Sequence, residues 1–454
     1  MERMEDRLNI IQDYEMMLTL TKNDYAFASA ELLRMAARIN KKRGFLFVST
    51  VLGKHLAVPP QMPLLTGALL AMIYAQKTYV EKSDLIPSVV NALKKQEYAQ
   101  EVLRQVESQR IQLPEETLFI GFAETATALG HAVFKTFQSN ATYIHTTREQ
   151  IADLEPFVTF EEEHSHATSH RLYVEDTEKL LKAKRIVLID DEITTGNTVI
   201  NIIETLRQRF PDVKDYTILS ILDWRSASQR KQFEQLQQQW GMNIQFYSIV
   251  SGTFTCIGTP LLTTQPIEPV IESLNEVELL SISEKIDRKY YRSIAENGKE
   301  NNAPYMMATG RLALTAEQHQ EQREQLGKIA RKLKSMRKGG PTLVVGTGEF
   351  MYVPMQLAAE MGEDVYFQST TRSPIYHSNE PDYTITEKIA FDSPENNGVE
   401  NYLYNIEIRP YSELFLIVER IANKEAINSI TKALQSLHIE NIHIICMHEL
   451  EGGE

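Results

Sequence analysis

The chain has 454 residues, 43% of them hydrophobic and 24% charged, which is typical of a folded globular protein and excludes a disordered or fibrous one. Its formal net charge of −14 argues against a general nucleic-acid-binding scaffold, because neutralising phosphates needs an excess of Lys and Arg. The length exceeds that of one ordinary hydrophobic core and predicts two domains.

Targeting and crosslinking signals are few. The two cysteines, Cys256 and Cys446, provide neither a disulfide framework nor a cysteine-based zinc site. The first ten residues (MERMEDRLNI) are charged throughout and lack the apolar stretch of a signal peptide. The longest apolar run, residues 62–75, is too short to span a bilayer. We therefore expect a cytoplasmic protein without a membrane partner.

Residues 1–40 are predicted to be helical, because YEMMLTL and FASAELLRMAARI carry apolar residues at helical spacing. A short β-type run follows at 44–50 (GFLFVST), and the helical pattern returns from 66 to 108. Apolar runs then alternate with amphipathic segments. The expected strands are 117–122, 141–147, 185–190 and 216–224, and the expected helices are 125–137 and 197–210. This alternation predicts an α/β fold with a mostly parallel sheet and helices on both faces.

The second half of the chain changes character twice. Residues 265–340 are polar and contain a loop-like stretch (295–304) and a charged helical segment that starts with TAEQHQ. After Gly340 the βαβ alternation resumes in TLVVGTG, FMYVPMQLAAEM and DVYFQSTT, and later in ELFLIVER, EAINSITKALQSL and NIHIICM. The predicted division is a first domain at 1–264 with an N-terminal helical and hood segment, a helical linker at 265–340, and a smaller α/β domain at 341–454.

The two units resemble each other. LFIGFAETATALGHAVF and LVVGTGEFMYVPMQLAA both read as strand, tight turn with Glu, and helix, and YIHTTRE and YFQSTTRSP both end a strand in Thr-Thr-Arg. In the second unit the acidic pair of IVLIDDEITTGNT becomes Val418-Glu419, and the Thr-Gly-Asn-Thr turn becomes Asn-Lys-Glu-Ala. The second domain is thus interpreted as a degenerate repeat of the first. The alternative is the general likeness of any two βαβ units.

The segment VLIDDEITTGNT (187–198) carries the strongest chemical signal. A buried strand delivers Asp190 and Asp191 to its carboxyl end, where ligands of α/β sheets bind. The turn that follows opens a helix, and its amides, its hydroxyls and the positive potential of the helix N-terminus suit a phosphate. The residues expected to form this phosphate cup are Thr194, Thr195, Gly196, Asn197 and Thr198. Two carboxylates beside a phosphate would repel it unless they faced sugar hydroxyls and a divalent cation.

This combination resembles the signature of type I phosphoribosyltransferases, whereas an ordinary strand–turn–helix with surface acids is the alternative. In that family the acidic pair holds the ribose hydroxyls and the turn holds the 5-phosphate of 5-phosphoribosyl-1-pyrophosphate (PRPP). The resemblance therefore implies that Asp190 and Asp191 bind PRPP and, with it, Mg²⁺. It also implies substitution at the anomeric carbon with release of pyrophosphate, so no covalent nucleophile is needed.

Two further elements match the family pattern. The turn after the first core strand binds pyrophosphate in these enzymes, and the residues predicted for that role here are Ala123, Glu124, Thr125 and Ala126. Glu124 is unexpected beside pyrophosphate, and binding Mg²⁺, binding a substrate hydroxyl and capping the helix stay open for it. Arg148 resembles the basic catalytic position of orotate-type enzymes, although Glu149 stands where those enzymes often have lysine.

A histidine-rich stretch, FEEEHSHATSH, lies where the family places a mobile loop over the reaction centre. His164 and His166 are predicted catalytic residues that stabilise departing pyrophosphate or move a proton. With His170, the same spacing also suits a transition metal, and a solvated polar loop is the third interpretation.

Several segments together resemble a narrower family, the phosphoribosyltransferases of bacterial tellurite-resistance and stress gene clusters. These segments are RGFLFVSTVLGKH, FIGFAETATALGH, YIHTTRE, FEEEHSHATSH and LIDDEITTGNT, and Thr371 to Pro374 reads TRSP, the motif that names the second domain of that family. The resemblance implies an orotate-like transferase core followed by a TRSP domain, and a stress-response role in nucleoside biosynthesis. Homo-oligomerisation and association with other stress-cluster proteins stay open.

Two regions are candidates for completing the site. In the second domain an anion site is predicted from Gly346, Glu349, Thr371 and Arg372, with a structural ion pair of Arg372 as the alternative. Near the N-terminus, residues 44–58 (GFLFVSTVLGKHLAV) are a candidate hood that recognises the acceptor, with Lys54 and His55 as its candidate residues, and SGTFTC (251–256) is a candidate for its other side. Solvated turns are the alternative for both segments. If the second unit wraps onto the first, the acceptor pocket is an interdomain cleft.

The predicted function is a glycosyltransferase of the pentosyltransferase class, a phosphoribosyltransferase. It would use PRPP and Mg²⁺ to transfer phosphoribose to a small, nucleobase-like acceptor, and its partners are small-molecule substrates rather than nucleic acid. The alternative functions are a non-catalytic sensor of PRPP or nucleotides and an assembly protein of a stress-response complex, because fold does not determine function.

Overall fold

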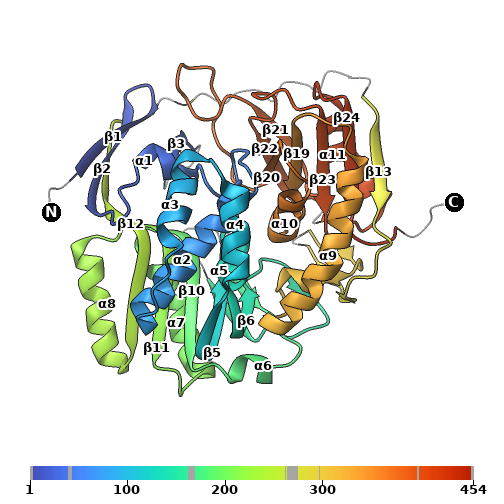
Figure 1. The fold of residues 1–454 in the computed structure, drawn as a ribbon. Coiled ribbons are helices and arrows are strands. Elements are labelled where there is room, and N and C mark those ends of the chain that lie inside the picture. The colour runs from blue at the N-terminus through green and yellow to red at the C-terminus, as the bar shows by residue number, and fades with distance from the viewer. Residues whose placement is uncertain are drawn as a thin grey trace.

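The computed structural model describes residues 4–38, 43–161, 169–260, 262, 275–295, 297–395 and 398–450. Two α/β units lie side by side (Figure 1), the first in blue to green and the second in orange to red. Each unit has its own sheet, and the long helix α9 (Ala316–Met336) runs along the second unit toward the first.

The first unit contains an eight-stranded sheet with the order β1-β2-β12-β11-β10-β5-β6-β18. Its strands are β1 (Met4–Ile11), β2 (Tyr14–Lys22), β5 (Ile111–Gly121), β6 (Phe137–His145), β10 (Arg185–Ile193), β11 (Asp215–Asp223), β12 (Asn243–Ile257) and β18 (Leu314–Thr315). The five strands from β12 to β6 are parallel, whereas β2 and β18 pair with their neighbours in antiparallel fashion. The predicted α/β fold with a mostly parallel sheet is confirmed.

The prediction of a helical N-terminus is wrong for most of that segment, because residues 4–22 form the hairpin of β1 and β2. In β2 the side chains of Tyr14, Met16, Leu18 and Leu20 are buried, so the apolar residues also follow the two-residue period of a strand. Pairing of β2 with the end of β12 decides between the two periods. A one-turn helix, α1 (Ser29–Leu32), precedes a second hairpin of β3 (Leu33–Ala37) and β4 (Phe45–Ser49).

Helices cover the large sheet. They are α2 (Gln61–Tyr79), α3 (Ile86–Lys95), α4 (Ala99–Ser108), α5 (Ala126–Phe134), α6 (Glu178–Leu181), α7 (Asn197–Arg209) and α8 (Ala227–Trp240). In Figure 1, α2 to α4 lie in front of the sheet. Residues 61–75 of α2 are all buried, because α2 packs against α3, α4, α5 and the sheet at once. Among the described residues, no helix is long and apolar enough to cross a membrane.

The second unit contains a five-stranded, fully parallel sheet with the order β13-β24-β23-β19-β20. Its elements are β13 (Val277–Ser281), β19 (Thr342–Gly346), α10 (Tyr352–Glu360), β20 (Val365–Ser369), β23 (Glu413–Val418), η2 (Lys424–Ile427), α11 (Asn428–Gln435) and β24 (Asn441–Cys446). A hairpin of β21 (Lys388–Asp392) and β22 (Glu400–Tyr404) follows β20, as the hairpin of β8 (Val158–Glu161) and β9 (Ser169–Leu172) follows β6.

The strand order supports the internal repeat. The series β11-β10-β5-β6 of the first unit corresponds to β24-β23-β19-β20 of the second, and both series are parallel. The helices that follow the equivalent strands β5 and β19, namely α5 and α10, pack against each other. At their contact the rings of His131 and Tyr352 are stacked, with centroids 3.4 Å apart.

Residues 265–340, predicted to be a helical linker, are mixed where the structure describes them. They contain α9 and η1 (Met307–Thr309), but also β13, which enters the second sheet, and β18, which enters the first. The remaining short strands of this segment are β14 (Arg288–Lys289), β15 (Ser293–Ile294), β16 (Glu300–Asn301) and β17 (Tyr305–Met306), and β15 pairs with β7 (Gln150–Ile151) of the first unit. Strands of this segment pair with strands of both units, so the segment connects the units through their sheets. Such long-range strand pairing is not encoded in local polarity.

Candidate active site

One cavity of about 230 Å³ lies at the carboxyl ends of the parallel strands β5 and β10. It is lined by Arg43, Leu46, Phe47, Lys54, His55, Ala123, Glu124, Thr125, Arg148, Asp190, Asp191, Glu192, Ile193, Thr194, Thr195, Gly196, Thr198, Val199, Thr371 and Ser373. The acidic pair and the phosphate turn are predicted from one segment, 187–198, and the turn after β5 is predicted from another; this cavity brings all three together.

Asp190 and Asp191 lie near the end of β10 and face the cavity. The backbone N–H of Asp191 donates to the carboxylate of Asp190 at 3.0 Å. Burial, reinforced by Glu192, raises the pKa of Asp191 to about 6, which makes its negative charge costly. Glu192 forms an ion pair with Arg43 at 2.6 Å. Hydroxyl donors or a cation in the cavity would therefore stabilise the ionised pair.

The turn after β10 forms a cup at the N-terminus of α7. Gly196 has φ +87°, a left-handed conformation, and a Cβ at this position would lie 2.7 Å from Cε2 of Phe233. Thr194, Thr195 and Thr198 line the cavity beside it. Asn197 does not line the cavity, and its backbone N–H donates to the hydroxyl of Thr195 at 3.2 Å. The cup thus combines hydroxyl groups with the positive end of a 13-residue helix.

The turn after β5 also lines the cavity, with Ala123, Glu124 and Thr125, whereas Ala126 is buried in the first turn of α5. The peptide bond between Ala123 and Glu124 is cis. The carboxylate of Glu124 forms ion pairs with Lys54 and, at 3.5 Å, with Arg148. Burial acts to raise the pKa of Glu124, but these cations lower it below its usual value. Glu124 is thus ionised and paired within the protein, an arrangement that the sequence does not reveal.

Arg148 lines the cavity three residues after β6, and contacts from both units hold its backbone. Its N–H donates to the carboxylate of Glu349 at 2.9 Å, and the hydroxyl of Thr147 donates to the same carboxylate at 2.6 Å. The Nε of Arg148 donates to Nε2 of the buried His170 at 3.4 Å. A glutamate of the second unit therefore orients a candidate catalytic residue of the first.

His164 and His166 lie outside the described residues, so the predicted roles of the histidine-rich stretch stay predictions. His170 is described, and its Nδ1 lies 3.0 Å from the hydroxyl of Thr146. Among the described residues there is no group of three or more His, Cys, Asp or Glu side chains that could hold a metal ion.

The predicted hood segment forms one wall of the cavity. Lys54 and His55 both line it and are buried, and burial together with Lys54 lowers the pKa of His55 to about 3. Within SGTFTC, Phe254 packs edge-on against Phe45 and Phe47 of β4. This segment packs against the hood through Phe254, which does not line the cavity.

The lining residues that no site prediction named individually are Arg43, Leu46, Phe47, Glu192, Ile193, Val199 and Ser373. The guanidinium of Arg43 lies 4.7 Å from the ring centroid of Phe45. Leu46 and Phe47 lie within the predicted hood segment, in a short β-type run that has no ligand-binding signature of its own. Ser373 is part of the TRSP motif, which is the signal that pointed to this segment.

The residues of the predicted second-domain anion site have different surroundings in the structure. Thr371 lines the first unit's cavity, and the carboxylate of Glu349 bonds to Thr147 and Arg148. Gly346 ends β19, and Arg372 follows Thr371 at the interface between the units.

Two families of known proteins match this chain, one after the other. Residues 32–253 match the family described as phosphoribosyl transferase, and residues 308–434 match the TRSP domain described as C-terminal to it. A search of curated proteins finds no match.

Solved structures with some similarity include three adenine phosphoribosyltransferases. The Trypanosoma brucei enzyme is 18% identical with a TM-score of 0.24, and the match covers 33% of this chain and 64% of that enzyme, which is less than two thirds of its length. For the Saccharomyces cerevisiae enzyme the identity is 10%, the TM-score 0.27 and the coverage 49% and 97%. For the Rhodothermus marinus enzyme the values are 12%, 0.27, 48% and 93%. Identities and scores this low bear on neither substrate nor mechanism. On the two family matches, in this order, the chain belongs to the phosphoribosyltransferases that carry a C-terminal TRSP domain.

Proposed function

We propose that the chain transfers phosphoribose from PRPP to a small, nucleobase-like acceptor and releases pyrophosphate. The observation that carries this proposal is the single cavity that joins the carboxylates of Asp190 and Asp191 to the cup at Gly196 and to the turn at Ala123–Thr125. These three elements suit the ribose hydroxyls, the 5-phosphate and the pyrophosphate of PRPP, respectively. We assign Asp190, Asp191 and Arg148 to the reaction centre.

In this proposal each group acts on a different part of PRPP. The cup and the N-terminus of α7 bind the 5-phosphate, and the acidic pair accepts hydrogen bonds from the ribose hydroxyls. Arg148 and the amides of the turn after β5 offset the charge that grows on the departing pyrophosphate. Holding both substrates in one small cavity supplies the remaining rate enhancement through orientation.

The donor set fits Mg²⁺, which proteins commonly hold through one or two carboxylates together with substrate phosphates. Asp190 and Asp191 would hold it, and bound Mg²⁺ would neutralise charge on pyrophosphate. The raised pKa of Asp191 agrees with this assignment, because a nearby cation relieves the cost of ionising a buried carboxylate.

The wall formed by Leu46 and Phe47 is suited to a flat, partly apolar acceptor, with Arg43 at its edge. The resemblance to proteins of tellurite-resistance and stress clusters adds a physiological hypothesis, namely that the product is a nucleoside-like stress metabolite made in the cytoplasm. A sensor that binds PRPP without turnover is the competing function.

The test measures pyrophosphate release with PRPP, Mg²⁺ and a panel of nucleobases. Wild-type protein should release pyrophosphate with at least one base, and Asp190→Asn combined with Asp191→Asn should abolish release. Asp212→Asn, an exposed aspartate close to the amino end of β11, is the control and should retain wild-type activity. Wild-type activity in the double variant would refute the assignment of the site. Tight PRPP binding without release with any base would favour the sensor.

A further inference from the structure

The second unit repeats the hydrogen bonds of the first around its strand-end turn. In the first unit the N–H of Ala123 donates to the hydroxyl of Thr146 at 2.8 Å. In the second, the N–H of Gly348 donates to the hydroxyl of Thr370 at 2.9 Å. Each of these threonines lies two residues before an arginine, so Arg148 and Arg372 occupy equivalent positions. The repeat therefore extends to the elements that bind pyrophosphate in the proposed function.

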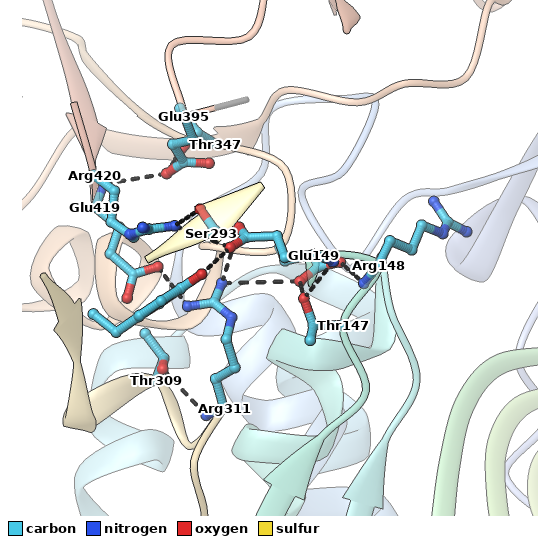
Figure 2. A network of polar contacts seen from close by, with 12 residues as sticks. Thr147, Arg148, Glu149, Ser293, Thr309, Arg311, Thr347, Glu395, Glu419 and Arg420 are labelled. Carbon is cyan, nitrogen blue, oxygen red and sulfur yellow. Dashed lines mark hydrogen bonds and ion pairs between the residues drawn. The ribbon is translucent and has the colours of Figure 1, made fainter. Parts of the chain in front are cut away.

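The second unit does not use this layout for a site of its own. Glu419, which corresponds to Asp191, accepts a hydrogen bond from Arg311 at 2.7 Å (Figure 2). It also accepts one from the N–H of Met306 at 2.9 Å. Glu395 lies beside it and accepts a hydrogen bond from Thr347 at 2.6 Å. The space that remains next to Glu395 is about 20 Å³, too small for a sugar phosphate. Protein side chains, two of them acidic, thus occupy the equivalent position.

The same network holds the two units together. Arg420 is buried and bonds to Glu149 of the first unit at 3.0 Å and to Ser293 at 2.9 Å (Figure 2). Arg311 lies 3.8 Å from the carboxylate of Glu349, which accepts hydrogen bonds from the hydroxyl of Thr147 and the N–H of Arg148. The strand-end turn after β6 is therefore fixed against the second unit.

The segment that follows β20 of the second unit lies at the first unit's cavity instead. Thr371 and Ser373 of the second unit line this cavity together with residues of the first unit. The buried Lys54 bridges the two sides, because its ammonium donates to the carbonyls of Gly348 at 3.0 Å and Thr370 at 2.8 Å and pairs with Glu124. The hydroxyl of Tyr404 donates to the carbonyl of Ser373 at 2.6 Å. Thr371 and Ser373 thus form a braced part of the cavity wall, and Arg372 lies between them in the chain.

Arg372 adds positive charge to this wall. Its electrostatic effect reaches Glu124 on the cavity and Glu149 in the buried network. Within the part of the chain that the structure describes, no carboxylate forms an ion pair with its guanidinium at 4.0 Å or less. Glu124 already has Lys54 and Arg148 as ion-pair partners. The positive charge of Arg372 is thus available to an anion bound in the cavity near Glu124.

We propose that the TRSP segment is part of the first unit's active site, in which Thr371, Arg372 and Ser373 bind the pyrophosphate group of PRPP and of the product. This inference rests on the proposed function. The second unit then acts as an internal, non-catalytic partner that completes a site which the first unit only partly encloses. Its acidic, filled counterpart site explains why the space beside Glu395 in the second unit is too small for a sugar phosphate.

The test is isothermal titration of the full chain, with Mg²⁺, against pyrophosphate, PRPP and ribose 5-phosphate in turn. Arg372→Gln should weaken binding of pyrophosphate and PRPP at least tenfold, because a charge-assisted contact is lost. Ser373→Ala should weaken both several-fold, and Arg372→Lys should recover part of the affinity. Ribose 5-phosphate should bind all variants equally. Arg331→Gln, an exposed arginine on α9, is the matched control.

The outcomes separate this inference from the proposed function. If wild-type protein binds all three ligands and Arg372→Gln binds pyrophosphate as well as Arg331→Gln does, the inference is overturned and the proposed function stands. If Arg372→Gln weakens ribose 5-phosphate as much as pyrophosphate, the role of Arg372 is structural and the inference is again overturned. If wild-type protein binds none of the ligands, both are overturned.

Discussion

Truncating Glu349 should loosen the first unit although the residue belongs to the second. Its carboxylate accepts hydrogen bonds from the hydroxyl of Thr147 at 2.6 Å and the N–H of Arg148 at 2.9 Å, and only 10% of its side chain is exposed. Hydrogen bonds to a charged group contribute about 1.5–3 kcal/mol each, so Glu349→Ala should lower the free energy of unfolding by about 3 kcal/mol or more. Arg311 keeps Glu419 as its partner at 2.7 Å and adds little to this loss.

Urea denaturation followed by tryptophan fluorescence measures this effect in the first unit, because Trp224 and Trp240 both lie there. Glu349→Gln keeps one acceptor oxygen and should lose about half as much stability. Glu363→Ala, an exposed glutamate of the same unit, should behave as wild type. Because the N–H of Arg148 loses its acceptor, Glu349→Ala should also weaken PRPP binding.

A double-mutant cycle isolates the contact itself. Thr147→Val combined with Glu349→Ala should cost less than the sum of the two single changes, with a coupling energy of about 1 kcal/mol or more. The reasoning is refuted if Glu349→Ala matches Glu363→Ala in both urea denaturation and PRPP affinity.

Two further predictions concern the cavity itself. Gly196→Ala should weaken binding of ribose 5-phosphate in calorimetry, because φ +87° costs about 1–2 kcal/mol for a residue with a Cβ and that Cβ would lie 2.7 Å from Cε2 of Phe233. Gly241→Ala is the matched control, since Gly241 also has a positive φ (+61°) but nothing within 4 Å of the added Cβ, and equal affinity in the two variants would contradict the cup. PRPP affinity should rise as pH increases through about 6, where Asp191 ionises, and this rise should be absent in Asp191→Asn. Burial raises the pKa of Asp191, so ionising this carboxylate destabilises the fold. The Asp191→Asn variant should therefore be more stable than wild type above pH 6 and should lose this advantage below the ordinary aspartate pKa of about 4. A stability advantage that persists in acid would contradict this assignment.

Local sequence determined the centre of the candidate site. The acidic pair and the phosphate cup lie within twelve consecutive residues, so the strand, the turn and the helix that follows suffice to predict their proximity. The parallel sheet of the first unit and the second βαβ unit were likewise predictable, because buried strands and amphipathic helices have different apolar periods. The repeat of Thr-Thr-Arg was visible in the sequence as well.

Long-range contacts decided the rest. Apolar residues in β2 fit both a helix and a strand, and the edge of β12 selected the strand. Lys54 is predicted from the sequence as a candidate for acceptor recognition, yet folding buries it between Glu124 and the carbonyls of the second unit. The placement of Ser373 on the first unit's cavity depends on how two repeats pack, and no local pattern records that packing. A sequence specifies which groups are available, whereas the burial and pairing of charges far apart in the chain determine which of them share a site.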